Sequence, residues 1–327
     1  MKLHLDQKRF QEAITITAQE KRILPIYVEK DYWVTYVLKL IFTDSNLKSY
    51  TVFKGGTALS KCFDIIERFS EDIDLTILVK DGETDNELKR KIRAISKKVE
   101  KDLSEINLEG VTNKRGNIRK TAHEYPILQK GNFGQVRDKV IIEASWLGNF
   151  EPYHPAEITS FVAEMMESKG FSDMITEYEL EPFEINVLDV KRTFCEKIMS
   201  LVRFSFSEYP IDDLKNKIRH IYDLNQLLEL DEINKFLRSD DFNKMMIKVG
   251  EDDVDSYKND NQWLDNHPKD SILFADLETT WSKIRDSYLY EFKLLVFGDL
   301  PNEEKILESL KKIKSEIDLM NWNLSKK

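Results

Sequence analysis

The sequence predicts an α+β fold, in which a mixed β-sheet flanked by helices is followed by a helical C-terminal domain. Short β-prone runs alternate with helical patterns as far as Val187, whereas helical patterns alone continue beyond Val190. With 327 residues, of which 41% are hydrophobic, the chain is long enough for two domains with real cores. We therefore expect domains at residues 1–189 and 190–327.

The first predicted domain opens with two helices, at residues 6–21 and 28–42, because apolar residues recur there at helical spacing on either side of Pro25. A short strand at residues 50–53 then ends at a pair of glycines. The remaining elements are expected as helices at residues 57–63 and 85–103 and strands at residues 72–79, 122–128, 139–146, 158–163 and 182–187. The strand at 72–79 becomes continuously apolar, which is typical of the centre of a sheet.

The second predicted domain consists of helices with prolines between them. These helices are expected at residues 190–206, 212–229, 231–248, 272–297 and 302–318. An acidic run, Glu251-Asp252-Asp253-Val254-Asp255, separates two of the helical groups. Because charge runs are usually solvated, we expect this run to be a surface loop.

Composition and charge argue against several classes of protein. The chain has 49 lysines and arginines against 59 aspartates and glutamates, and its formal charge of −10 argues against indiscriminate binding of nucleic acid. Cys62 and Cys195 lie far apart without partners at zinc spacing, so neither disulfides nor zinc are predicted. No signal peptide and no run of about 20 apolar residues is seen, so we expect a soluble, cytoplasmic protein without a membrane segment.

The strongest chemical signal is a pair of carboxylates, Asp72 and Asp74, at the start of the predicted central strand. Residues two apart in a strand point to the same face, so these side chains lie side by side. Like charges this close are costly unless a cation neutralises them or one is protonated. Their oxygen atoms suit Mg²⁺, which takes further oxygens from substrate phosphates. The alternative is two ordinary charges at a strand edge.

A glycine turn, Gly55-Gly56-Thr57, precedes these carboxylates by one element. Without side chains, its backbone can approach a polyphosphate closely, and the amides that open the following helix point at negative charge. Thr57 either donates to a phosphate or caps the helix, and Ser70 either touches the nucleotide or positions the strand. The ordered combination indicates phosphoryl or nucleotidyl transfer, whereas an ordinary turn is the alternative for the glycines.

These motifs resemble those of the AbiEii/AbiGii toxin family, a bacterial branch of the polymerase-β nucleotidyltransferases that includes the MenT-type toxins. The first two are Phe53-Lys54-Gly55-Gly56-Thr57-Ala58-Leu59 and Arg68-Phe69-Ser70-Glu71-Asp72-Ile73-Asp74-Leu75. The segments Glu29-Lys30-Asp31-Tyr32-Trp33, Arg192-Thr193-Phe194-Cys195-Glu196-Lys197 and Arg219-His220-Ile221-Tyr222-Asp223-Leu224 also match in order. The resemblance covers most of residues 28–228 and implies a polymerase-β-like nucleotidyltransferase domain.

The resemblance implies a third carboxylate beside Asp72 and Asp74, for which Glu143 is the natural candidate. Glu143 is a lone acid among apolar neighbours in a predicted strand. It would help to hold Mg²⁺, or Mn²⁺ in its place. The alternative is that Glu143 faces outward and pairs with Lys139 or another cation.

The resemblance also implies that Lys197 and Asp223 belong to the site. Lys197 borders the apolar face of its helix and therefore needs an anionic partner. By resemblance that partner is a triphosphate, whereas a salt bridge near Glu196 or with the helix of Asp223 is the alternative. Asp223 can also pair with Arg219, which lies four residues before it.

A basic segment follows the paired carboxylates. Its cations are Lys89, Arg90, Lys91, Arg93, Lys97, Lys98 and Lys101, followed by Lys114, Arg115, Arg119 and Lys120. Such a run is usually a solvated helix face. In a chain of charge −10, however, this segregation favours contact with RNA. The candidate RNA-binding residues are Lys89, Arg90, Arg93, Lys97, Arg115 and Arg119.

The residues and the resemblance together predict a nucleotidyltransferase. Two Mg²⁺ ions at the three carboxylates would bridge the phosphates of a nucleoside triphosphate, and Gly55, Gly56 and Lys197 would bind the departing phosphates. The resemblance further implies that the acceptor is the 3′ end of tRNA, whose extension blocks translation. The protein would then be the toxin of a toxin–antitoxin or phage-defence system, with a separately encoded antitoxin.

Three other functions agree with parts of the sequence. The enzyme can nucleotidylate a protein or a small molecule instead of RNA. The chain can also be a catalytically silent module that binds a nucleotide or a partner, or a structural component of a defence complex. The intact set of acidic motifs argues against a silent module. The preferred nucleotide is not predicted.

Overall fold

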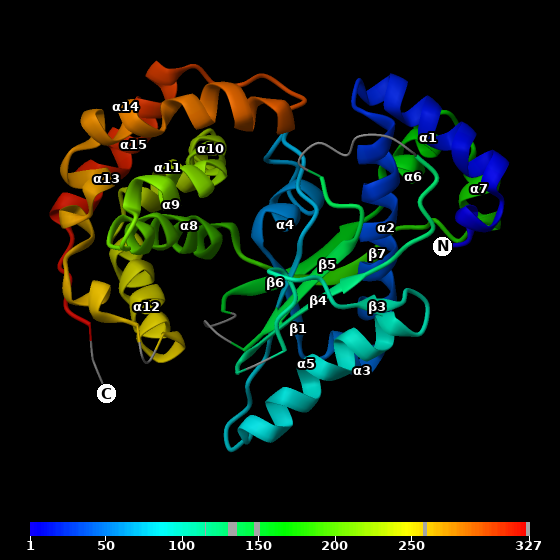
Figure 1. The fold of residues 1–327 in the computed structure, drawn as a ribbon, viewed down its shortest axis with the longest axis horizontal. Coiled ribbons are helices and arrows are strands. Elements are labelled where there is room, and N and C mark those ends of the chain that lie inside the picture. Colours follow the sequence, from blue (N-terminus) through cyan, green and yellow to red (C-terminus); the bar gives the residue numbers. More distant parts are fainter. Residues whose placement is uncertain (115, 130–135, 147–150, 258–259, 325–327) are drawn as a thin grey trace. The chain divides into compact units, whose positions relative to one another are not determined.

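The computed structural model describes residues 1–114, 116–129, 136–146, 151–257 and 260–324, which divide into two compact units (Figure 1). The first unit comprises the described parts of residues 1–64, 69–146 and 153–188. The second comprises the described parts of residues 65–68, 147–152 and 189–327. The first unit contains the sheet, and the second is helical.

Within the described residues, the first unit is built around a seven-stranded sheet with the order β3-β4-β5-β2-β1-β7-β6. The strands are β1 (Thr51–Lys54), β2 (Ile73–Ile77), β3 (Glu105–Ile106), β4 (Ile118–His123), β5 (Val140–Ser145), β6 (Tyr153–Ile158) and β7 (Phe183–Leu188). β2 pairs antiparallel with β1 and parallel with β5, and β1 pairs parallel with β7. The predicted α+β class with a mixed sheet is therefore confirmed.

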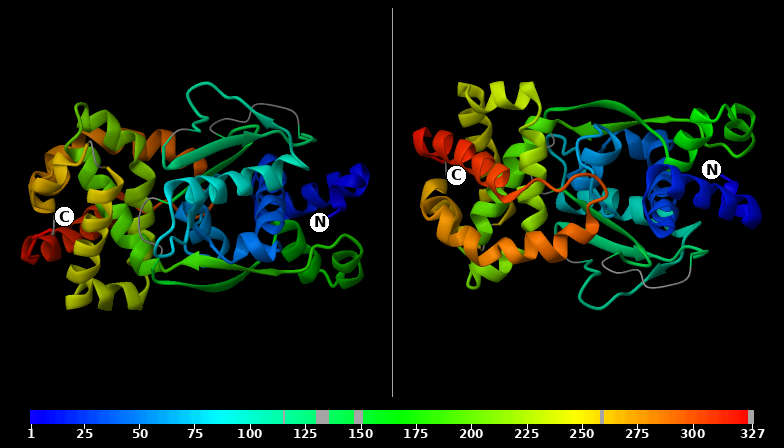
Figure 2. Two further views of the ribbon diagram at one scale, coloured as in Figure 1. Left: turned by 90° about the horizontal axis from the view of Figure 1, so that it is seen from below. Right: turned by 90° about the horizontal axis from the view of Figure 1, so that it is seen from above.

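Helices α2 and α5 help to bury the apolar face of this sheet. Ile73, Leu75 and Ile77 of β2 share one core with Val37 of α2 and Ile95 of α5. Successive strand residues point to opposite faces, so the residues between them in β2 point away from this core. The helices of the unit are η1 (Leu3–Leu5), α1 (Gln7–Lys21), α2 (Pro25–Phe42), α3 (Ser45–Lys48), α4 (Gly55–Lys61), α5 (Asp85–Glu100), α6 (Phe161–Ser168) and α7 (Ser172–Glu177). Figure 2 shows α1, α6 and α7 together at one end of the unit.

The second unit is an assembly of mostly short helices. They are α8 (Val190–Ser205), α9 (Pro210–Asn216), α10 (Ile218–Leu227), α11 (Asp231–Leu237), α12 (Asp240–Ser256), η2 (Gln262–Asp265), η3 (Pro268–Asp270), α13 (Ile272–Ala275), α14 (Leu277–Asp286), η4 (Ser287–Glu291), η5 (Phe292–Leu295) and α15 (Glu303–Leu319). Three of the predicted helices are broken. The one expected at residues 272–297, for example, passes from α-helix to a π turn and then to a 3₁₀ turn.

Two strands lie earlier in the chain than predicted. The strand expected at residues 122–128 is β4, whose polar residues Arg119 and Lys120 obscured the apolar pattern of a strand. The strand expected at residues 158–163 is β6. It ends early because Ser160 caps α6, its hydroxyl accepting a hydrogen bond from the amide of Ala163 at 3.2 Å.

The acidic run at residues 251–255 belongs to a helix, so the prediction of a loop was wrong. α12 continues to Ser256. Asp252 accepts a hydrogen bond from the guanidinium of Arg192 at 2.6 Å, and Arg192 is buried. A buried arginine requires anionic partners, which explains why this run contributes to the packing of the unit.

Two further predictions concern cysteines and membrane segments. Cys62 and Cys195 are both free thiols. Among the described residues, no helix combines the length and the apolar character that crossing a membrane requires.

Candidate active site

A row of four charged residues crosses the sheet of the first unit, with two acids between two lysines. Asp74 of β2 is in register with Lys54 of β1 on one side and with Glu143 of β5 on the other. Glu143 is in turn in register with Lys120 of β4. Residues in register on neighbouring strands point to the same face. Asp72, two residues before Asp74, extends the acidic part of the row on that face.

Gly55 is the residue against which the Asp74 carboxylate lies. Its φ of +84° belongs to the left-handed region that side chains disfavour. A Cβ atom at this position would also lie 2.3 Å from Oδ2 of Asp74. Both constraints require glycine here, and they show that the predicted glycine turn and the predicted acidic strand meet.

The backbone of Asp72 is held by the start of α4. The hydroxyl of Thr57, which is buried, donates to the carbonyl oxygen of Asp72 at 2.7 Å. Oγ1 of Thr57 also lies 2.9 Å from the hydroxyl of Ser70. In this structure both hydroxyls therefore position Asp72. The roles in nucleotide binding expected for Thr57 and Ser70 stay predictions.

A second group of charges, which sequence reasoning missed, lies behind Asp72. Arg137 donates from its guanidinium to Oδ1 of Asp72 at 3.0 Å, and its backbone amide donates to the buried carboxylate of Glu71 at 2.9 Å. Lys30 is fully buried, lies 3.2 Å from Glu71 and donates to the carbonyl of Arg137 at 2.7 Å. Lys30 and Glu71 belong to two of the motifs that carry the family resemblance. They lie 41 positions apart in the chain, so no local sequence pattern indicates that they pair.

The electrostatics of Asp74 are those of a buried carboxyl group among like charges. Burial, together with the negative charges of Asp72 and Glu143, raises the pKa of Asp74 to about 7, although Lys54 and Lys120 act in the opposite direction. Within the described part of the chain, the Asp74 carboxylate has no hydrogen-bond or ion-pair partner. A divalent cation would supply the missing positive charge.

The available side chains fit a metal ion whose ligands come partly from the protein and partly from a substrate. Asp72 and Asp74 offer only oxygen atoms, which suit Mg²⁺. No group of three His, Cys, Asp or Glu side chains in the described ranges is placed to hold an ion. Mg²⁺ is commonly bound by one or two carboxylates together with substrate phosphates and water, so the pair is a sufficient protein contribution.

Glu143 has the cationic partner that was considered as an alternative, but the partner is a different lysine. Lys120 donates to its carboxylate at 2.9 Å from the neighbouring strand. Lys139 instead lies 3.0 Å from Asp138 and 3.5 Å from Glu124. The role of Glu143 as a third metal ligand stays a prediction.

Lys197 and Asp223 form a buried cluster in the second unit. Lys197 donates to Oδ2 of Asp223 at 2.7 Å, and Arg68 donates to both carboxylate oxygens of Asp223 at 2.7 and 2.8 Å. Burial alone would raise the pKa of Asp223, but Arg68 and Lys197 hold it well below its usual range. Arg68 thus replaces Arg219, the partner considered from the sequence. The role of Lys197 and Asp223 in catalysis stays a prediction.

The predicted RNA-binding residues divide into paired and unpaired cations. Arg119 donates to Glu105 at 3.2 Å, Lys97 pairs with Glu100, and Arg90 lies 3.8 Å from Glu87 on the exposed surface of α5. Lys89 and Arg93 have no such partner among the described residues. Arg115 lies outside the described residues.

Two carboxylates lie on a central strand, and a glycine turn at the start of a helix is held against one of them, as the motifs of a nucleotidyltransferase predict. The family model described as the nucleotidyl transferase AbiEii toxin of a type IV toxin–antitoxin system matches residues 37–309. The chain therefore belongs to the family of AbiEii nucleotidyltransferase toxins, as its motifs predicted. Enzymes of this family generally use a nucleoside triphosphate and a divalent metal ion.

Among solved structures, the chain is similar to MenT4, a nucleotidyltransferase toxin from Mycobacterium tuberculosis H37Rv. The two share 13% sequence identity with a TM-score of 0.48, and the alignment covers 94% of this chain and 98% of the other. No match was found among curated proteins.

Proposed function

We propose that this toxin transfers a nucleoside monophosphate from a nucleoside triphosphate to the 3′ end of tRNA in a reaction that depends on Mg²⁺. The observation that carries the proposal is the uncompensated charge of Asp74, whose pKa is raised to about 7 beside Asp72 and Glu143. A metal ion would balance the charge at this point, and the phosphates of a nucleotide would complete its coordination.

Each residue of the site has a proposed task. Asp72 and Asp74 hold the metal, which when bound neutralises phosphate charge and makes the acceptor hydroxyl more acidic. Glu143, whose carboxylate accepts a hydrogen bond from Lys120, would be a further ligand. The backbone of Gly55 and Gly56 approaches the phosphates closely, because no side chain intervenes. The family motifs add Lys197 as a ligand of the triphosphate, with Asp223 positioning its ammonium group.

The chemistry is a single displacement at phosphorus. The 3′ hydroxyl oxygen of the acceptor bonds to the α-phosphorus, the bond from that phosphorus to the pyrophosphate oxygen breaks, and the hydroxyl proton passes to solvent. The products are an extended tRNA and pyrophosphate. We propose that the extension stops translation in the cytoplasm, as part of a phage defence, until a separately encoded antitoxin intervenes.

The test is incubation of the purified protein with total tRNA, Mg²⁺ and each labelled nucleoside triphosphate in turn. We expect label in tRNA with the wild type and a loss of at least about 10³-fold in the Asp72→Ala, Asp74→Ala double variant, because metal ligands contribute several kcal/mol to the transition state. Asp81→Ala, which removes an exposed carboxylate just after β2, is the control and should retain full activity.

The acceptor and the metal are tested in the same assay. Chelation should abolish transfer, and added Mg²⁺ should restore it. Label that appears in protein or in a small molecule, and not in tRNA, would replace the proposed acceptor by another. Failure to transfer label from any of the nucleotides would overturn the proposed reaction.

A further inference from the structure

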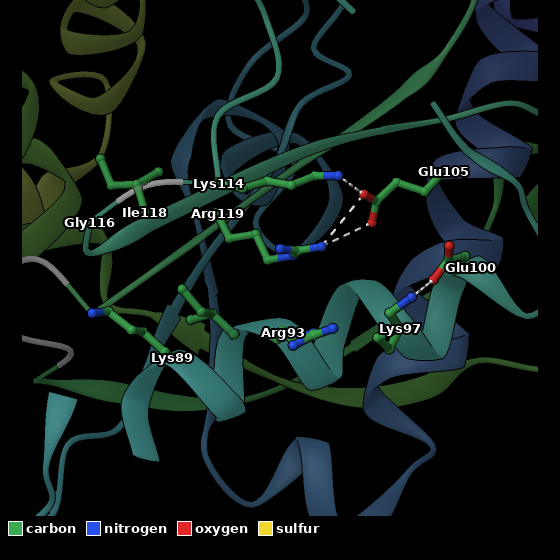
Figure 3. A pocket seen from close by; sticks show the side chains of 10 residues that line it. Lys89, Arg93, Lys97, Glu100, Glu105, Lys114, Gly116, Ile118 and Arg119 are labelled. Atoms are coloured by element: carbon green, nitrogen blue, oxygen red, sulfur yellow. Dashed lines mark hydrogen bonds and ion pairs between the residues drawn. The ribbon is translucent and has the colours of Figure 1, made fainter. Parts of the chain in front are cut away.

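The first unit contains a basic pocket between α5 and the β3–β4 connection (Figure 3). Its volume is about 690 Å³, and its cationic lining residues are Lys89, Arg93, Lys97, Lys114 and Arg119. Two carboxylates and two isoleucines also line it. This volume lies within the range of about 300–1,000 Å³ that is typical of ligand sites. Five cations against two acids make the pocket strongly positive in a chain of charge −10.

The acids of the pocket are already engaged by cations. Glu105 pairs with Lys114 and accepts from the guanidinium of Arg119 at 3.2 Å, and Glu100 pairs with Lys97 (Figure 3). Burial alone would raise the pKa of Glu105, but the hydrogen bond from Lys114 and the charge of Arg119 lower it. Its carboxylate therefore stays ionised and fixes these two cations in the wall of the pocket.

Two cations are left to bind a ligand. Within the described ranges, Lys89 and Arg93 have no acidic partner, and both are exposed. Figure 3 shows the guanidinium of Arg93 in the space between α5 and β4, on the side of the helix that faces Arg119. Exposed cations without acidic partners can bind an anion without first breaking an ion pair.

The spacing of the helix cations suits a row of phosphates. Lys89, Arg93 and Lys97 are four residues apart and thus lie on one face of α5, at steps of about 6 Å over a length of about 12 Å. The described lining contains no aromatic side chain on which a base could stack, and its two carboxylates are occupied. Such a wall recognises the charge of a backbone and does not read bases.

β4 connects this pocket with the row of charges at the candidate active site. Arg119 faces the pocket, and its neighbour Lys120 points to the opposite face, where it bonds to Glu143. Lys120 lies two strands from Asp74, which corresponds to roughly 10 Å across the sheet. Asn113 pairs with Lys120 along the outer side of β4, so a nucleic-acid strand that ends at Asp74 reaches the pocket by passing around this edge of the sheet.

We propose that the pocket binds the phosphate backbone of the RNA acceptor a few nucleotides before its 3′ end, and so positions that end at Asp72 and Asp74. The inference rests on the proposed function, because it concerns the acceptor of the same reaction. Lys89 and Arg93 carry the binding, and Arg119 and Lys114 complete the positive wall.

The test compares two double charge reversals in the first unit. Lys89→Glu, Arg93→Glu changes the pocket, whereas Lys8→Glu, Lys80→Glu changes the same charge at exposed positions that neither line it nor belong to the basic segment. For each we would measure KM for tRNA, KM for the nucleotide, and Kd for a labelled single-stranded oligoribonucleotide at several salt concentrations. Thermal unfolding of both variants confirms that they fold.

The pocket variant should raise KM for tRNA and Kd for the oligoribonucleotide at least about tenfold, because two backbone contacts are lost and repulsion is added. The slope of log Kd against log salt should fall by about 1.4, the contribution of two contacts to a single strand. KM for the nucleotide should not change, and the control variant should stay within about twofold of wild type.

The outcomes separate this inference from the reaction itself. If wild type labels tRNA but both variants behave alike, the pocket is not an RNA site and the proposed reaction stands. If wild type labels no tRNA, the proposed reaction fails, and Kd for the oligoribonucleotide decides on the pocket alone. If the pocket variant binds RNA as wild type does but no longer binds an acidic partner protein, the pocket is a protein-binding site and the inference is overturned.

Discussion

The two clusters of charge in this molecule differ in how far their charges are compensated. In the second unit, the buried carboxylate of Asp223 receives two hydrogen bonds from Arg68 and one from Lys197. In the first unit, the carboxylate of Asp74 has no such partner among the described residues, and Asp72 is paired with the half-exposed Arg137. Every charge of the first of these clusters is paired, whereas the other contains a carboxylate, that of Asp74, without a partner among the described residues.

This difference shows which cluster has a place for a metal ion. A buried carboxylate with three charge-assisted hydrogen bonds is satisfied, and breaking any of them costs free energy. A pair of carboxylates on one strand face, with the pKa of one raised to about 7, gains free energy when a cation arrives. A buried carboxylate without a cationic partner therefore indicates the metal and nucleotide site more directly than the number of charged residues in a cluster does.

The largest expected effect on stability comes from removing the acid of the complete cluster. Asp223→Ala leaves Arg68 and Lys197 buried without their partner, so we expect the free energy of unfolding to fall by about 3–5 kcal/mol. Chemical denaturation, followed by circular dichroism, measures this change. The outcome would show that the cluster stabilises the second unit.

Arg219→Ala is the matched control for that experiment. Arg219 was the partner of Asp223 considered from the sequence, but it is exposed, and Asp223 bonds to Arg68 instead. We expect its removal to change the free energy of unfolding by less than about 0.5 kcal/mol. Equal effects of the two substitutions would contradict the account of a buried, complete cluster.

The incomplete cluster should be most sensitive at the glycine beside it. Gly55→Ala places a Cβ atom 2.3 Å from Oδ2 of Asp74, so the carboxylate must move. We expect kcat/KM for nucleotide transfer to fall by about 10²-fold, the size of effect that a shift of about 1 Å produces in a reacting group. Steady-state kinetics with the labelled nucleotide measures the loss.

Gly82→Ala separates the contact from the backbone strain. Gly82 has a φ of +82°, nearly equal to that of Gly55, but a Cβ atom there meets nothing within 4 Å. In both variants, the left-handed backbone of the new alanine lowers the free energy of unfolding by about 1–2 kcal/mol. Activity should fall in Gly55→Ala alone, and a similar loss in both would mean that the approach to Asp74 is unimportant.

Those parts of the site that depend on neighbouring residues could be predicted from the sequence. Asp72 and Asp74 are two residues apart on a strand, and the glycine turn is the preceding connection, so periodicity and turn chemistry were sufficient. The fold class followed from the change of pattern near residue 190. The position of β4 was missed because Arg119 and Lys120 interrupt its apolar pattern. Arg119 donates to the hydroxyl of Ser96, and Lys120 donates to the carboxylate of Glu143.

The parts that depend on distant residues could not be predicted. Arg137 reaches Asp72 across 65 residues, and Arg68 reaches Asp223 across 155. A single sequence contains no periodicity that links such positions, because pairing across the sheet or between helices is decided by packing. For the same reason the sequence suggested Arg219 for Asp223 and Lys139 for Glu143, which are the neighbours along the chain.

The smallest expected effect is a dependence of stability on pH at Asp74. Its pKa in the folded protein, about 7, lies above the ordinary carboxyl value, so ionisation favours the unfolded chain. The stability lost through this group grows as the pH rises from about 4 to 7 and is constant above. The Asp74→Asn variant has no carboxyl group to ionise at this position, so it does not lose this stability. The variant should match wild type near pH 4 and exceed its free energy of unfolding at pH 8 by on the order of 2 kcal/mol.

Urea denaturation at both pH values, with and without Mg²⁺, tests this prediction. Asp81→Asn, in the exposed turn after β2, controls for the removal of one negative charge. Mg²⁺ should stabilise wild type at pH 8, because it neutralises the carboxylates, and should do little for Asp74→Asn. If the two proteins differ equally at pH 4 and pH 8, or if Mg²⁺ stabilises both alike, Asp74 does not lack a cation, and the contrast between the two clusters does not identify the metal site.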